Sequence, residues 1–127
     1  MSIKVFFILV LVLLFIIWYA FPRVLVCGDS MYPTYKNDEI LHSKRFFNRK
    51  NLQVGDVVVV HFKKSFPIEG ERTVIKRIAF MTEDSVFLLG DNPSESYDSR
   101  YYGEVPKSYV KCLISEQRAH EVKLEAI

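Results

Sequence analysis

Cysteine and histidine are scarce in this chain of 127 residues, which has two cysteines and three histidines. The cysteines, Cys27 and Cys112, lie far apart and belong to no C-x-x-C or Cys/His ligand spacing, so the sequence does not predict a zinc site. Because buried free cysteine is a common state in proteins, we expect free thiols rather than a disulfide bond. His42 and His61 lie in strand-like segments and His120 in a polar tail, so no histidine is positioned as a base.

Net charge is also small, at +2 from 17 basic and 15 acidic residues. No basic stripe interleaved with aromatic side chains is present, which argues against nucleic acid as a partner. The sequence contains neither an internal repeat nor a low-complexity segment. A chain of this length forms at most one domain together with an anchor.

A long hydrophobic run is present only at the N-terminus, from Val5 to Phe21. About 17 residues of helix span about 26 Å, the short end of what crosses a bilayer. Trp18 and Tyr19 lie at the far end of the run, where an aromatic belt would meet lipid headgroups. A cleaved signal peptide has the same polarity, but this run is longer than a usual hydrophobic region and ends without an A-x-A site. We therefore predict an uncleaved membrane anchor over residues 1–22.

Charges beside the run specify its orientation weakly. Lys4 and the amino terminus lie on the short side, while Arg23 and Lys36 lie on the other. By the positive-inside rule, the sequence favours the N-terminus inside and the rest of the chain outside.

Residues 23–115 contain short apolar runs separated by turn residues, a pattern typical of a compact, mainly β, mostly antiparallel domain. The expected strands are Val24–Cys27, Glu39–His42, Val57–Val60, Arg72–Phe80, Ser85–Leu89 and Tyr109–Ile114. Met81–Asp84 predicts a tight hairpin connection, and Gly90–Arg100 a polar loop. Residues 116–127 form a charged tail, expected to be a short helix or to fray.

Ser30 lies in the segment Gly28-Asp29-Ser30-Met31, shortly after the apolar run. A serine hydroxyl becomes a nucleophile only when a nearby base takes its proton, and its own N–H must face a developing oxyanion. Gly28 relaxes the backbone there. Taken alone, a serine before a turn is more often a turn or cap residue.

Lys76 lies among apolar residues in a predicted strand. Strict alternation places Val74, Lys76, Ile78 and Phe80 on one face, so the lysine has apolar neighbours. Desolvation lowers the pKa of a lysine, and a shift from about 10.4 to about 8 costs roughly 3 kcal/mol. A neutral lysine amine can act as a general base. The alternative is an outward-facing lysine on a half-exposed strand.

The loop Gly90–Arg100 is dense in small polar side chains, which a plain connection rarely needs. Asp98 and Arg100 can pair and brace the loop, and Ser96 can hydrogen-bond the amine of Lys76. The alternative is an ordinary solvated loop.

Together these segments resemble the bacterial type I signal peptidases. The motifs are Gly-Asp-Ser-Met-x-Pro-Thr at residues 28–34, Gly-Asp-Val-Val at 55–58, Lys-Arg at 76–77 and Gly-Asp-Asn-x-x-x-Ser-x-Asp-Ser-Arg at 90–100. The resemblance implies the fold shared by signal peptidases and self-cleaving repressors, after one transmembrane helix. A lysine at position 76, where the endoplasmic-reticulum type has histidine, points to the bacterial type.

The resemblance also implies residue roles. Ser30 would attack the scissile carbonyl and form an acyl-enzyme, with Lys76 as general base and the Ser30 N–H in the oxyanion hole. Ser96 would orient Lys76, while Asp98 and Arg100 would hold the loop. Gly28 and Met31 would support the nucleophile, and Gly28 removes the side-chain donor that some members have there.

The implied partners are exported preproteins with signal peptides and the lipid bilayer, with no cofactor or metal. The implied location is the cell membrane, with a single pass and the catalytic domain on the extracytoplasmic side. The sequence specifies no oligomeric state.

Two departures from the family favour a narrow substrate range. Residues 79–84 run straight into the next strand, so the second domain of larger members is missing, and Pro93 stands where many members have arginine. An accessory peptidase devoted to one substrate, such as a pilin or conjugation protein, is therefore an alternative. A non-catalytic membrane module that binds leader peptides is another. A soluble self-cleaving repressor is disfavoured by the membrane span.

Overall fold

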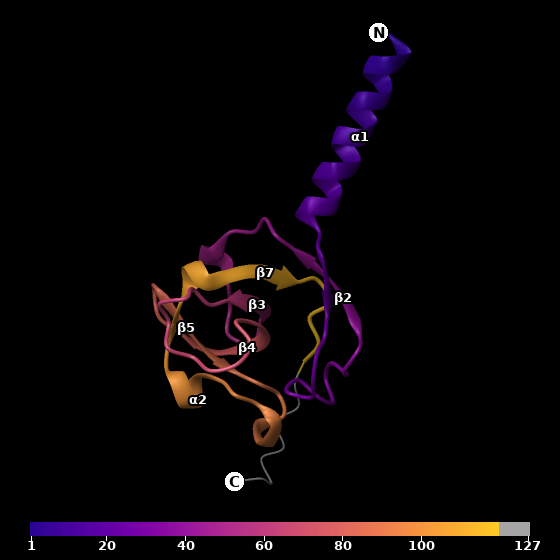
Figure 1. Ribbon diagram of the computed structural model, residues 1–127. Coiled ribbons are helices and arrows are strands. Elements are labelled where there is room, and N and C mark those ends of the chain that lie inside the picture. Colours follow the sequence, from indigo (N-terminus) through magenta and orange to yellow (C-terminus); the bar gives the residue numbers. More distant parts are fainter. Residues whose placement is uncertain (120–127) are drawn as a thin grey trace.

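The computed structural model describes residues 1–119, which form one N-terminal helix followed by a β domain (Figure 1). Helix α1 (Ile3–Ala20) begins after Ser2, whose hydroxyl accepts a hydrogen bond from the Val5 N–H at 3.2 Å. None of its residues is buried, and its mean hydropathy is 2.8 over 18 residues. Within residues 1–119 it is the one helix long and apolar enough to cross a membrane.

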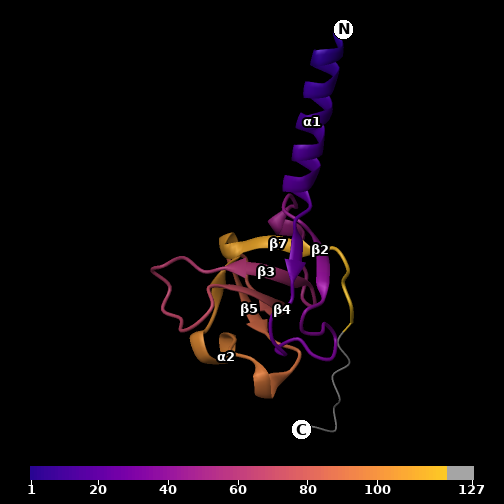
Figure 2. The same cartoon turned by 45° about the vertical axis from the view of Figure 1, so that its right-hand side comes forward.

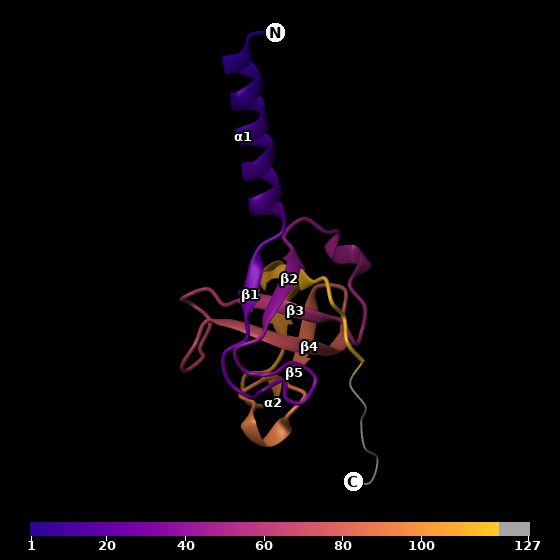
Figure 3. The same cartoon turned by 90° about the vertical axis from the view of Figure 1, so that its right-hand side faces the viewer.

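Within residues 1–119, seven strands form one sheet with the order β1-β2-β7-β3-β4-β5-β6, and every pair is antiparallel. Figure 3 shows β1 and β2 side by side below α1. The strands are β1 (Arg23–Leu25), β2 (Ile40–Lys44), β3 (Val57–His61), β4 (Thr73–Met81), β5 (Ser85–Leu89), β6 (Val105–Pro106) and β7 (Val110–Ile114). The predicted fold class, a mainly antiparallel β domain preceded by one N-terminal helix, is confirmed.

Strand β3 is buried on both faces, which explains its four consecutive valines. Val57 and Val59 belong to one hydrophobic cluster, while Val58 and Val60 belong to a second. β-branched side chains suit such a strand because they pack well on a pleated surface. The sheet therefore has a core on each side, and the neighbouring strand β4 has access to both.

The expected alternation along β4 is correct up to Ile78 and wrong at Phe80. Ile78 pairs with Leu88, but Phe80 pairs with Phe87, so the register shifts between them. The extra residue, Ala79, forms a β-bulge, and Phe80 is 67% exposed instead of sharing the face of Lys76. The hairpin predicted after β4 is confirmed, since the Thr82 N–H donates to the Ser85 carbonyl at 2.9 Å.

Four short helices within the described residues were not predicted, because segments of three or four residues have no hydrophobic period. They are η1 (Arg49–Asn51), η2 (Pro93–Glu95), α2 (Ser99–Tyr102) and η3 (Lys107–Tyr109). Asp98 is the N-cap of helix α2, and its side chain accepts from the Arg100 N–H. Gly103, with a φ of 80°, is the C-cap.

Helix α1 projects away from the β domain (Figure 2). Arg45, in the loop after β2, joins the domain to the end of α1. Its backbone N–H donates to the Ala20 carbonyl at 2.8 Å, and its Nε donates to the Tyr19 carbonyl at 2.9 Å. The guanidinium lies 4.2 Å from the centre of the Tyr19 ring. These contacts satisfy carbonyls that a helix end leaves without partners.

Both cysteines are free, Cys27 exposed and Cys112 buried. Of the expected tail 116–127, residues 116–118 lie against the domain, where Gln117 and Arg118 hydrogen-bond to it. Residues 120–127, which include His120, lie outside the described part of the chain.

Candidate active site

Ser30 lies in residues 26–39 between β1 and β2, a segment that we call the serine turn. Two fully buried side chains, Met31 and Tyr35, anchor it. The Tyr35 N–H donates to the Met31 carbonyl at 2.9 Å, which closes the turn. Gly28 enters the turn with a φ of 90°, and its N–H donates to Asn37 Oδ1 at 2.7 Å. A side chain at position 28 would be strained at this φ, so glycine is the residue the turn requires.

Lys76 lies in the middle of β4 and is 4% exposed. Its Nζ donates a hydrogen bond to Ser96 Oγ at 3.0 Å. Burial lowers the pKa of Lys76 from its ordinary 10.5 to about 8, while the Asp98 carboxylate opposes this shift and the Arg100 guanidinium adds to it. A lysine with this pKa is partly neutral near physiological pH.

Ser96 bridges Lys76 and Asp98, because its Oγ also donates a hydrogen bond to Asp98 Oδ2 at 2.8 Å. Asp98 Oδ2 also accepts from the Gly90 N–H at 3.0 Å, and Oδ1 accepts from Arg100 Nε at 2.8 Å. Burial raises the pKa of Asp98, but these hydrogen bonds outweigh it and hold the pKa below its usual value. The carboxylate therefore stays charged and fixes the orientation of the Ser96 hydroxyl.

Asn92, in the loop after β5, donates two hydrogen bonds to backbone carbonyls of the serine turn. The Asn92 N–H donates to the Ser30 carbonyl at 2.9 Å, and Asn92 Nδ2 donates to the Asp29 carbonyl at 3.0 Å. Gly90 touches both halves of the site: a Cβ there would lie 2.2 Å from Ser96 Oγ and 2.7 Å from the Ser30 carbonyl oxygen. The roles of Gly90 and Asn92 were not predicted, although the Gly-Asp-Asn motif was the available signal.

Arg77 and Asp91 form a second link that was not predicted. Arg77 Nε and Nη2 donate to the two carboxylate oxygens of Asp91 at 2.9 and 2.8 Å. Arg77 Nη1 also donates to the Gly55 carbonyl at 2.7 Å. Because Arg77 follows Lys76 and Asp91 follows Gly90, this paired fork fixes β4 against the loop that holds the serine turn.

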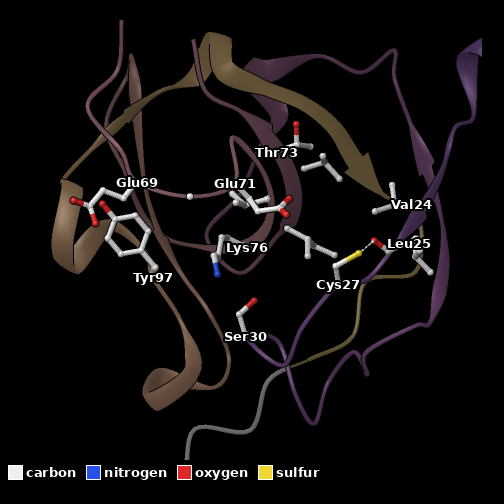
Figure 4. A pocket seen from close by; sticks show the side chains of 13 residues that line it. Val24, Leu25, Cys27, Ser30, Glu69, Glu71, Thr73, Lys76 and Tyr97 are labelled. Atoms are coloured by element: carbon white, nitrogen blue, oxygen red, sulfur yellow. Dashed lines mark hydrogen bonds between the residues drawn. The ribbon is translucent and has the colours of Figure 1, made fainter. Parts of the chain in front are cut away.

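Ser30 and Lys76 line one pocket of about 920 Å³. Its walls come from β1, β4, the loop before β4 and Tyr97, as the side chains in Figure 4 show. In that view the Lys76 amine and the Ser30 hydroxyl extend towards the same part of the pocket. The Tyr97 ring packs against Tyr101 and Tyr102, with ring centres 5.4 and 5.3 Å apart.

The structure brings all seven residues singled out from the sequence to this region. Ser30 and Lys76 face the pocket, Ser96 contacts Lys76, Asp98 and Arg100 lie behind Ser96, and Gly28 and Met31 flank Ser30. Neither the hydroxyl nor the backbone N–H of Ser30 makes a hydrogen bond within residues 1–119. In the same range no group of three His, Cys, Asp or Glu residues could hold a metal ion.

Ser30 and the buried Lys76 line the same pocket of an antiparallel β domain, and hydrolases with a serine nucleophile need a base near its hydroxyl. A family model described as signal peptidase, peptidase S26, matches residues 1–82 and 80–115. The chain therefore belongs to the signal peptidase family, and the family predicted from the motifs is confirmed.

Several curated relatives are subunits of one mitochondrial protease. The chain is 30% identical to mitochondrial inner membrane protease subunit 1 of Mus musculus over 108 residues, which cover 69% of this chain and 63% of the relative. The same subunit of Xenopus tropicalis is 30% identical over 110 residues, covering 70% and 64%. That of Schizosaccharomyces pombe is 30% identical over 117 residues, covering 76% and 72%. The chain thus spans just under two thirds of the vertebrate relatives.

Proposed function

We propose that this chain is a membrane-bound serine endopeptidase that removes N-terminal signal peptides from exported preproteins. The observation that carries the proposal is the common pocket of Ser30 and Lys76, in which burial lowers the pKa of Lys76 to about 8. A purely structural role would favour an apolar residue at position 76, because a buried amine costs free energy.

The reaction would begin when the neutral Lys76 amine takes the proton of the Ser30 hydroxyl. Ser30 Oγ then attacks the scissile carbonyl, and the oxyanion is stabilised by the Ser30 N–H. When this intermediate collapses, the scissile C–N bond breaks and the acyl group stays on Ser30. The leaving amine takes the proton from Lys76 and departs as the new amino terminus. Lys76 then deprotonates a water molecule that hydrolyses the acyl-enzyme.

The supporting residues fit this course. Asn92 Nδ2 donates to the Asp29 carbonyl, which belongs to the same planar peptide unit as the Ser30 N–H, so this N–H cannot rotate freely. The buried Ser96 and Asp98 orient the Lys76 amine without a direct ion pair, which would hold the lysine in its charged form. Lys76 can therefore shed its proton and remain in place.

Cleavage should depend on pH through Lys76. Only the neutral amine can act as base, and the pKa of Lys76 is about 8, so kcat/KM is expected to rise about fivefold from pH 7 to pH 8 and to level off about tenfold above its pH 7 value from about pH 9. A lysine with its ordinary pKa of 10.5 would keep the rate rising beyond pH 9. A pH profile measured between 6 and 10 with one preprotein separates the two cases.

Helix α1 supports the membrane anchor that we propose over residues 1–22. The proposal includes a single pass through the cell membrane with the pocket on the extracytoplasmic side. β4 and β5 are joined by a tight hairpin at residues 82–84, which leaves no inserted domain between them. This supports the narrower form of the proposal, an accessory peptidase with one dedicated substrate.

The test is cleavage by the full chain in liposomes. A preprotein with small residues at −1 and −3 should be cut once, after position −1, as shown by sequencing the new amino terminus. The matched substrate carries a bulky residue at −1 and should remain intact. A folded protein that binds the signal peptide but cuts no preprotein would instead be a leader-peptide-binding module.

A further inference from the structure

Residues 116–118 lie after the last strand and contact Thr34 and Tyr35 on one side and Val57 and Arg77 on the other; we call them the C-terminal strap. The family model ends at residue 115, so the strap lies outside the matched region. At one end the strap contacts the serine turn: Arg118 Nη1 donates to the Thr34 carbonyl at 2.9 Å, and the Arg118 N–H donates to Tyr35 Oη at 3.0 Å. Tyr35 Oη in turn donates to the Glu116 carbonyl at 2.6 Å.

The other contacts of the strap are with the strands around Lys76. Gln117 pairs with the backbone of Val57, accepting from its N–H at 2.7 Å and donating to its carbonyl at 2.8 Å. Arg77 Nη2 donates to the Arg118 carbonyl at 2.8 Å. Arg77 follows Lys76 in β4 and pairs with Val57 in β3, so the strap is hydrogen-bonded to the part of the sheet that carries the lysine.

Arg118 is held firmly in this position. Its Nη1 lies between the two carboxylate oxygens of Glu39, and its Nη2 donates to Glu116 at 2.7 Å. The guanidinium also lies 4.9 Å from the centre of the Tyr35 ring. Glu39 precedes β2 and accepts, through its carbonyl, from Val26 at the start of the serine turn, so Arg118 braces both ends of that turn.

We propose that the strap is a positioning device that sets the serine turn against the strand that carries Lys76, with Arg118 as its principal positioning residue. The proposal rests on the proposed function above. Three independent links would then hold the Ser30 turn: Asn92 from the loop after β5, Asn37 from the turn itself, and Arg118 from the strap.

A positioning role and a stabilising role predict different results. The Arg118 side chain is 38% exposed, and exposed ion pairs contribute little to stability. A displacement of the nucleophile of a fraction of an ångström lowers the rate of the chemical step, because that step requires aligned reacting atoms. Substrate binding in the pocket does not involve Arg118, since the strap is not part of its lining.

The test compares Arg118→Ala with wild type by preprotein cleavage in liposomes. We expect kcat to fall about tenfold, KM to stay within about twofold, the midpoint of the pH profile to stay unchanged, and the melting temperature to change little. Arg118→Lys should recover only part of kcat, because a single amine cannot replace the planar fork that contacts Thr34, Glu39 and Glu116. Arg49→Ala is the matched control: Arg49 also donates to a backbone carbonyl, that of Val110 at 2.6 Å, but lies away from the pocket.

Three outcomes would overturn the proposal. The first is an unchanged kcat in Arg118→Ala and in a chain that ends at Ser115. The second is a rise in KM with kcat unchanged. The third is a fall in kcat that equals the fraction of protein that is unfolded. If wild type itself cuts no preprotein, the proposed function fails first, and the two failures are thereby distinguished.

Discussion

Lys76→Met is expected to abolish cleavage and at the same time to stabilise the domain. Without a base for Ser30, kcat/KM should fall by at least about 10³-fold. Methionine is unbranched, similar in length to lysine and uncharged, so it can fill the same buried position between Ser96 and the core. Lowering the pKa of Lys76 from 10.5 to about 8 corresponds to a cost of about 3 kcal/mol at neutral pH, which the methionine variant avoids.

The pH dependence of unfolding tests whether the buried Lys76 destabilises the domain. Between pH 8 and about 10.5 the unfolded chain binds more protons at Lys76 than the folded chain does, so the free energy of unfolding of wild type should rise with pH in this window. In Lys76→Met this rise should be absent, and its stability should exceed that of wild type most clearly below pH 8. Chemical denaturation at pH 7 and pH 10 measures both effects.

Ser30→Ala is the companion variant. It should lose cleavage to the same extent, because the two groups would act as a unit, but keep the stability profile of wild type. Ser94→Ala, in the same polar loop as Ser96 but exposed, is the matched control and should remain active. An active Lys76→Met would mean that another base serves Ser30, and a less stable Lys76→Met would mean that the amine is held by contacts that outweigh its burial.

Most of the sheet could be predicted from the sequence because its strands carry dense β-branched and apolar runs bounded by turn residues. The burial of Lys76 followed from the same pattern, since Val74 and Ile78 flank it on one face. The exposure of Phe80 could not be predicted, because a β-bulge depends on how β5 pairs and leaves no mark in the alternation itself. Short local patterns therefore predict the faces of a strand only until its register changes.

The contacts that connect the two halves of the site lie between distant segments. The Asn92 N–H donates to the carbonyl of Ser30, and the Arg118 side chain donates to that of Thr34, so each acceptor is a backbone group that any residue type would present. Motifs signal which side chains matter, whereas a carbonyl acceptor leaves no signal in the sequence. This explains why the seven residues of the candidate site and the contacts Ser96–Lys76 and Asp98–Arg100 could be expected from the sequence, whereas the bonds of Asn92 and Arg118 to backbone carbonyls could not.

Gly90→Ala is expected to cause the second largest loss, although Gly90 carries no side chain that could take part in the reaction. A Cβ at this position would lie 2.2 Å from Ser96 Oγ, 2.5 Å from Ser96 Cβ and 2.7 Å from the Ser30 carbonyl oxygen. The Ser96 hydroxyl could turn away, but the backbone fixes Ser96 Cβ and the Ser30 carbonyl, so the loop and the turn that carries Ser30 must move apart. We expect kcat/KM to fall by about 10²-fold, and the free energy of unfolding to fall by about 1–3 kcal/mol.

Two further variants show whether the loss comes from this contact. Gly103→Ala is the matched control, because Gly103 has a φ of 80° but nothing within 4 Å of a Cβ; it should lose about 1 kcal/mol of stability through backbone strain and keep its activity. Ser96→Ala combined with Gly90→Ala should recover no activity, since the clash with the Ser30 carbonyl remains when Ser96 Oγ is removed. Full activity in Gly90→Ala would show that the loop and the serine turn can separate without harm. The contact between Gly90 and the Ser30 carbonyl would then have no part in aligning the nucleophile with its base.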